Sequence, residues 1–85
     1  MLSQGGTAGL MKIRPTHYQV QVKIFEMAWC VYTRTKGDHL IYHYPGAVRP
    51  VVIPKYKEAP TFVIKNNMRV IGMSRVEYRQ FLEGA

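Results

Sequence analysis

The fold of this chain is decided by residues 31–54, which read VYTRTKGDHLIYHYPGAVRPVVIP. Three runs in this stretch are rich in the β-branched and aromatic residues that are typical of strands. The runs are separated by Lys36-Gly37-Asp38 and by Pro45-Gly46, which have the composition of chain-reversing turns. We therefore predict three antiparallel strands joined by short connections, covering residues 30–35, 39–44 and 50–53.

The segment before the first strand is compatible with a helix or with a strand. Residues 16–19, Thr-His-Tyr-Gln, fit a capping box in which the Thr16 oxygen accepts from the third helical amide and Gln19 reaches back. A helix would then cover residues 17–28. Residues 19–24 read QVQVKI and alternate with period two, which equally suits a strand. Periodicity alone leaves both alternatives open.

As a helix, residues 17–28 would bury a broad apolar face. Two rows of side chains at helical spacing contribute to this face. The first row consists of Val20, Ile24, Met27 and Ala28, and the second of Tyr18, Val22, Phe25 and Trp29.

Two further helices are predicted after the strands. Pro60 can open a helix and Gly72 can end it, because proline suits the first helical turn and glycine the residue past the last one. Ser74 and Glu77 form a second capping box, which predicts a short final helix. The first helix would run through Phe62, Val63, Ile64, Met68 and Ile71. The second would have an apolar side made of Val76, Tyr78, Phe81 and Leu82.

These elements predict one α+β domain over residues 13–85. The order helix, three strands, helix, with a short C-terminal helix, gives one antiparallel sheet with helices on one face and the other face available to a partner. Residues 1–12 are expected to be a disordered lead, because the first ten are uncharged, carry glycine and serine and show no periodicity. Met11 could itself be the start of the protein.

Charge gives the first indication of function. Twelve Lys and Arg residues against five Asp and Glu residues give a net charge of +7, which concentrates polyanions at the surface. Nucleic acid is the leading partner class, and an acidic protein would explain the same charge. Residues 1–15 lack the apolar stretch that is typical of a secretory signal, and no apolar run approaches the roughly 18 residues that span a membrane. We therefore expect a cytoplasmic protein that does not associate with membranes.

Several kinds of chemistry lack their residue patterns in this sequence. There is no glycine-rich phosphate loop and no cysteine pair for zinc, so we expect no cofactor. The single cysteine, Cys30, has the apolar neighbours of a buried free thiol. Asp38, His39 and His43 are the minimum for a weak metal site, because the two histidines face the same side of a strand. We assign no metal to them.

His39 is the best candidate for acid–base chemistry. Histidine can give or take a proton near neutral pH, and His39 begins a predicted strand directly after a Gly-Asp turn. Arg34 and Lys36 precede it and can hold a phosphate beside it. His17 and His43 lack such neighbours in the sequence.

Three motifs together resemble the HicA (YcfA-like) family of toxin endoribonucleases. They are RTKGDHLIY at residues 34–42, VVIP at residues 51–54 and GMSRVEY at residues 72–78. Their spacing agrees with that family from about Ile13 to Leu82. The resemblance implies a fold like that of double-stranded-RNA-binding domains, and it implies a helix for residues 17–28.

The resemblance also implies a function. Members of this family cut mRNA and are neutralised by a HicB antitoxin, so we expect a toxin that is a monomer alone and a hetero-oligomer with a HicB-like antitoxin. His39 takes the position of the catalytic histidine of a metal-independent endoribonuclease, since the 2′-OH of RNA can serve as the nucleophile. Phosphate contacts are expected from Arg34, Lys36, Lys55 and Lys57, and base stacking from Tyr56, with Tyr42 and Tyr44 as further candidates.

A non-catalytic RNA-binding module of the same fold is the alternative interpretation, and in it His39 does no chemistry. A structural subunit whose basic surface meets an acidic protein is a further possibility. The sequence departs from the family at Tyr56, which stands where a second histidine is common. It also departs at residues 59–61, where Ala-Pro-Thr replaces a Lys-Gly-Thr opening of the second helix.

Overall fold

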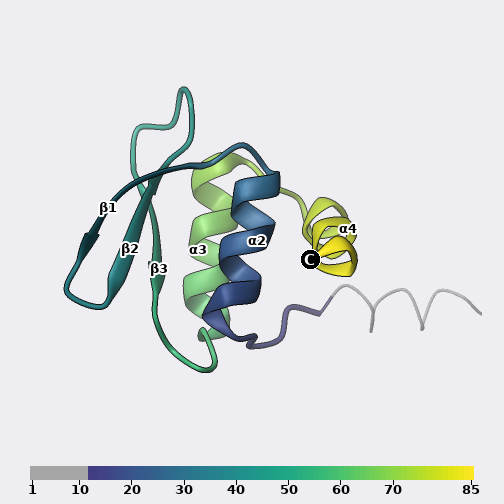
Figure 1. The fold of residues 1–85 in the computed structure, drawn as a ribbon. Coiled ribbons are helices and arrows are strands. Elements are labelled where there is room, and N and C mark those ends of the chain that lie inside the picture. The colour runs from purple at the N-terminus through teal and green to yellow at the C-terminus, as the bar shows by residue number, and fades with distance from the viewer. Residues whose placement is uncertain (1–11) are drawn as a thin grey trace, which may run out of the picture.

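Residues 12–85 are described by a computed structural model, and they form an α+β arrangement of three antiparallel strands and three helices (Figure 1). In chain order the elements are α2 (Tyr18–Met27), β1 (Val31–Lys36), β2 (His39–His43), β3 (Val51–Pro54), α3 (Thr61–Ile71) and α4 (Arg75–Gly84). The predicted α+β class, with three antiparallel strands and three helices in the predicted order, is confirmed. The expected disordered lead, residues 1–12, and the alternative start at Met11 lie outside the described residues, except for Lys12.

The sheet has the order β1-β2-β3, and each strand is antiparallel to its neighbour. The turn between β1 and β2 contains Gly37 at a φ of 61°, a left-handed conformation that glycine adopts without strain. This turn places Lys36 directly opposite His39. On its other side His39 pairs with Pro54 of β3. His39 therefore lies between Lys36 of β1 and Pro54, the last residue of the edge strand β3.

The two faces of the sheet differ in burial because side chains alternate along each strand. Tyr42, Val51 and Ile53 point into the core, and α2 and α3 cover this face (Figure 1). The opposite face carries the half-buried or exposed side chains of Arg34, Lys36, His39, Ile41 and Val52. The prediction that helices cover one face and leave the other open is confirmed.

Residues 17–28, for which periodicity allowed a helix or a strand, contain the helix α2. The predicted capping box at Thr16 is wrong. His17 is the N-cap, and its Nδ1 accepts a hydrogen bond from the Gln19 amide at 3.1 Å. The Thr16 carbonyl accepts from the Ala59 amide, and the Thr16 hydroxyl accepts from the side chain of Gln21. Because these longer-range bonds hold Thr16, the helix begins one residue later.

Two residues expected on the buried face of α2 are exposed. Met27 is 39% exposed and Trp29 is 79% exposed. Met27 is the last residue of the helix, and Trp29 lies beyond it with a φ of 77° in the left-handed region. The Trp29 amide donates to the carbonyl of Glu26 at 3.1 Å as the chain turns toward β1. The helical spacing no longer applies there, so the predicted burial of both side chains is wrong.

The boundaries of α3 and α4 follow the predicted signals. Pro60 precedes α3, and Gly72 ends it at a φ of 71°. The capping box of α4 is confirmed: the Glu77 amide donates to the Ser74 hydroxyl at 3.1 Å, and the Ser74 amide donates to the Glu77 carboxylate at 2.8 Å. This cap satisfies two backbone amides at the start of the last helix.

Each of these helices also exposes one of its large apolar residues. Phe62 is 74% exposed and Val76 is 51% exposed, whereas Ile64 and Tyr78 are buried. Each exposed residue stands two positions before a buried one, which is roughly 200° around an α-helix. The opposite side of each helix therefore faces the core. Val76 does not share the buried side of α4 with Tyr78, so its predicted place on the apolar side of that helix is wrong.

Within residues 12–85, none of the helices combines the length and the apolar content that crossing a bilayer requires.

Candidate active-site cleft

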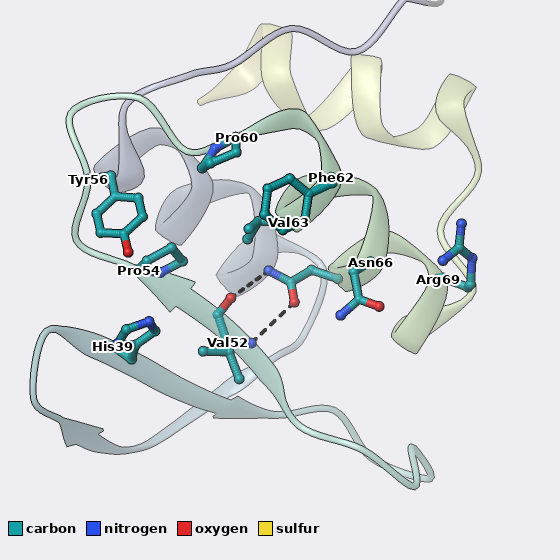
Figure 2. A pocket seen from close by; sticks show the side chains of 10 residues that line it. His39, Val52, Pro54, Tyr56, Pro60, Phe62, Val63, Asn66 and Arg69 are labelled. Carbon is teal, nitrogen blue, oxygen red and sulfur yellow. Dashed lines mark hydrogen bonds between the residues drawn. The ribbon is translucent and has the colours of Figure 1, made fainter.

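A cleft of about 590 Å³ opens between the end of the sheet and α3 (Figure 2). Its volume lies in the range of about 300–1,000 Å³ that is usual for small-molecule sites. Most of its surface is apolar, with a few polar groups at the two ends. The side chains around it belong to His39, Val52, Pro54, Tyr56, Pro60, Phe62, Val63, Asn66, Asn67 and Arg69.

The wall formed by α3 is held to the sheet by the buried amide of Asn67. Its Nδ2 donates to the Val52 carbonyl at 2.8 Å, and its Oδ1 accepts from the Val52 amide at 3.2 Å (Figure 2). β3 is an edge strand, so these two backbone groups have no neighbouring strand to bond. One side chain therefore replaces a missing strand and fixes the distance between the two walls of the cleft.

His39 lies at one end of the cleft, at the first position of β2. Its Nδ1 is 2.9 Å from the Asp38 carboxylate, and the imidazole side chain is 44% exposed. A carboxylate on one ring nitrogen fixes the orientation of the ring and leaves Nε2 as the nitrogen that can exchange a proton with a ligand. This Asp–His pair has the geometry required of a positioned acid–base group.

Tyr56 lies beside His39 at the same end of the cleft (Figure 2). The two rings meet edge to face, with centroids 6.4 Å apart and planes at 72°. The Tyr56 carbonyl accepts from the amide of Tyr18 at 3.1 Å, which ties this loop to the start of α2. Tyr56 as a whole is 43% exposed. Tyr56 is therefore both anchored and accessible to a ligand.

The predicted cationic residues separate into two groups. Lys36 pairs with His39 across the turn, and Arg34 lies two positions along the same strand on the same face of the sheet. Both side chains are exposed. Lys55 and Lys57 are also exposed and follow β3. None of these four cations is among the residues that line the cleft. The Lys55 amide donates to the Asp38 carbonyl at 2.8 Å, so its backbone supports the turn that carries His39.

Two polar residues of the cleft, Asn66 and Arg69, were missed by the sequence analysis. They extend from α3 together with Phe62, at spacings of four and three residues, which places all three along one side of the helix. The Asn66 Oδ1 accepts from Arg49 at 3.1 Å. In the sequence these three residues form a second row on the helix, opposite Ile64 and Met68, and this spacing is the signal that could have found them.

Tyr42, one of the tyrosines expected to stack on bases, is not available to a ligand. It is 3% exposed, and its hydroxyl donates to the Glu26 carboxylate at 2.8 Å. Burial and this carboxylate raise its pKa above the ordinary value for tyrosine. Tyr44 is half-buried against the core. Among the three candidates Tyr56 alone lines the cleft.

The structure also bears on other chemistry that the sequence raised. Cys30 is buried, as predicted, and burial raises the pKa of its thiol to about 11. At neutral pH it is therefore a neutral thiol and a poor nucleophile. Within residues 12–85 there is no group of three His, Cys, Asp or Glu side chains that could hold a metal ion.

Comparisons with family models, with curated proteins and with solved structures found no match to this chain.

Proposed function

We propose that this protein is a metal-independent endoribonuclease in which His39 acts as general acid or base. The observation that carries the proposal is the Asp38–His39 pair at 2.9 Å, at the end of an open cleft and next to Lys36. A proton-transfer group beside a cation is what phosphodiester cleavage of RNA requires. The net charge of +7 supports a polyanionic substrate.

The proposed reaction uses the nucleophile that RNA itself carries. The 2′-OH attacks the adjacent phosphorus, the bond to the 5′-oxygen of the next nucleotide breaks, and a 2′,3′-cyclic phosphate forms. His39 accepts the proton of the 2′-OH or gives one to the leaving 5′-oxygen, and water makes the other of these two proton transfers. Lys36 and Arg34 offset the charge that develops on the phosphorane oxygens. Asp38 is a positioning residue, because it acts through the imidazole.

The biological role within this proposal is that of a HicA-like toxin acting on mRNA. It is supported by the motifs at residues 34–42, 51–54 and 72–78 and by an element order compatible with a fold like that of double-stranded-RNA-binding domains. A HicB-like antitoxin would silence such an enzyme by covering His39 and the exposed cations of β1. Positive charge on this face would speed the association with an acidic partner.

The purified protein is expected to cleave single-stranded RNA in the presence of EDTA and to leave 2′,3′-cyclic phosphate and 5′-hydroxyl ends. The chemistry needs only proton transfer and fixed cations, so chelation should not affect the rate. Product ends are identified by mass spectrometry, and DNA of the same sequence is the control because it lacks the 2′-OH. Loss of cleavage in EDTA that added divalent metal restores would contradict the proposal.

Lys36→Ala is expected to weaken RNA binding and to lower the slope of log affinity against log salt by about 1, because one phosphate contact releases about one counterion. Lys23→Ala is the control, since Lys23 is exposed on α2, which covers the opposite face of the sheet. Fluorescence anisotropy over a salt series measures both slopes. Equal slopes for the two variants would remove Lys36 from the RNA-binding surface.

A further inference from the structure

We propose that the cleft binds one unstacked base of single-stranded RNA, with Phe62 as the stacking surface and Asn66 as the group that contacts the edge of the base. This inference rests on the proposed function, since it names how the same site holds its substrate. It assigns a role to the side of α3 that faces the cleft, and it concerns residues that take no part in proton transfer.

Phe62 has the exposure expected of a ligand contact. Its side chain is 74% exposed, lies outside the hydrophobic core of residues 12–85 and lines the cleft. The neighbouring wall is apolar, with Val52, Pro54 and Val63 around it (Figure 2). An aromatic ring at an apolar cleft offers a base the stacking surface that single-strand-binding proteins use.

The two asparagines of α3 differ in what they can offer a ligand. Both amide atoms of Asn67 are used by the backbone of Val52. The oxygen of Asn66 accepts from Arg49, which leaves its nitrogen as a donor at the cleft. Ring nitrogens and carbonyl oxygens of bases are acceptors. Asn66 is therefore the side chain placed to bond the edge of a base stacked on Phe62.

The two ends of the cleft carry groups that can contact phosphates of an RNA backbone. His39 lies at one end and Arg69 at the other, with Phe62 and Val52 between them (Figure 2). A base can reach Phe62 only when its face is free, which is the case in single strands and loops and not within a duplex. The cleft therefore favours single-stranded RNA, with a phosphate at Arg69 and the scissile phosphate at His39.

The test is an abasic scan of a short single-stranded RNA, measured as binding to the His39→Ala protein so that the RNA stays intact. One position at a time carries an abasic site. We expect one position at which base removal weakens binding by roughly 5- to 100-fold, as loss of one stacked base does. Adding Phe62→Ala should weaken binding of the intact RNA by a similar factor and abolish the difference between intact and abasic RNA at that position.

Trp29→Ala is the matched control, because Trp29 is 79% exposed and lies outside this cleft. It should leave the abasic effect unchanged. Phe62→Leu keeps apolar bulk without an aromatic face, so it should lose most of the difference in binding between intact and abasic RNA. Thermal unfolding of each variant verifies the fold. The inference is wrong if base removal weakens binding as much in Phe62→Ala as it does without that substitution. It is also wrong if Trp29→Ala and Phe62→Ala change RNA binding equally.

The outcomes also separate this inference from the proposed function. If the parent protein cuts RNA while Phe62 and the base act independently, the base site is wrong and the endoribonuclease assignment stands. If the parent shows the coupled base effect but never cuts RNA, the chain is an RNA-binding module and the base site stands.

Discussion

Replacing His39 by alanine will lower the rate of RNA cleavage by about 10²–10⁴, because that is the usual contribution of a general acid or base. The imidazole is 44% exposed and contacts the Asp38 carboxylate and the Tyr56 ring. Its removal should therefore change the free energy of unfolding by no more than about 1 kcal/mol. RNA affinity should stay close to that of the parent, since the cations and the cleft remain.

His43→Ala is the matched control for this experiment. His43 lies on the same strand and the same face of the sheet as His39, but it pairs with Val31 at the far end and does not line the cleft. Single-turnover cleavage, RNA affinity and urea unfolding are measured for both variants, together with growth arrest on expression. Parental cleavage by His39→Ala, or an equal loss in His43→Ala, would show that the catalytic assignment is wrong.

The sheet could be predicted because its signals are local. The turn at Gly37 and the runs of β-branched residues on either side determine which strands pair, and the Lys36–His39 register follows from the short turn. The Ser74 capping box is equally local, because both of its bonds join residues three apart. Elements defined by such short-range contacts can be read from sequence.

The errors occurred where contacts distant in sequence decide the outcome. The start of α2 depends on the Thr16–Ala59 bridge, which no local pattern reveals. The exposure of Phe62 and Val76 depends on which side of each helix meets the rest of the molecule. Apolar residue type indicates that a helix is amphipathic, but the direction of its buried side is set by packing.

Sequence reasoning could predict the part of the candidate site that lies on the β1–β2 hairpin, but not the part that lies on α3. His39 and Lys36 are neighbours through one turn, so sequence reasoning could place them together. Asn66 and Arg69 reach the same cleft because α3 packs beside β3, and that packing depends on a bond between the side chain of Asn67 and the backbone of Val52. A polar residue in the middle of a helix gives no local indication of this role.

Asn67→Ala is expected to lower the free energy of unfolding by about 2–4 kcal/mol. The substitution removes two hydrogen bonds and leaves the amide and carbonyl of Val52 without their partner, at about 1–3 kcal/mol for each unsatisfied group that water does not reach. The Asn67 side chain is 2% exposed, so a cavity adds to the loss. Small domains are stable by about 5–15 kcal/mol, so this is a large fraction of the total.

Asn66→Ala is the control, because it changes the same residue type one position away on the exposed side of α3. Its effect on unfolding should stay within about 0.5 kcal/mol. Urea unfolding gives the two free energies, and amide hydrogen exchange at Val52 reports the bond itself. Exchange at Val52 should accelerate in Asn67→Ala and stay slow in Asn66→Ala. If Val52 stays protected in both variants, the Asn67 amide does not hold α3 against the edge of the sheet, and the cleft between them has another support.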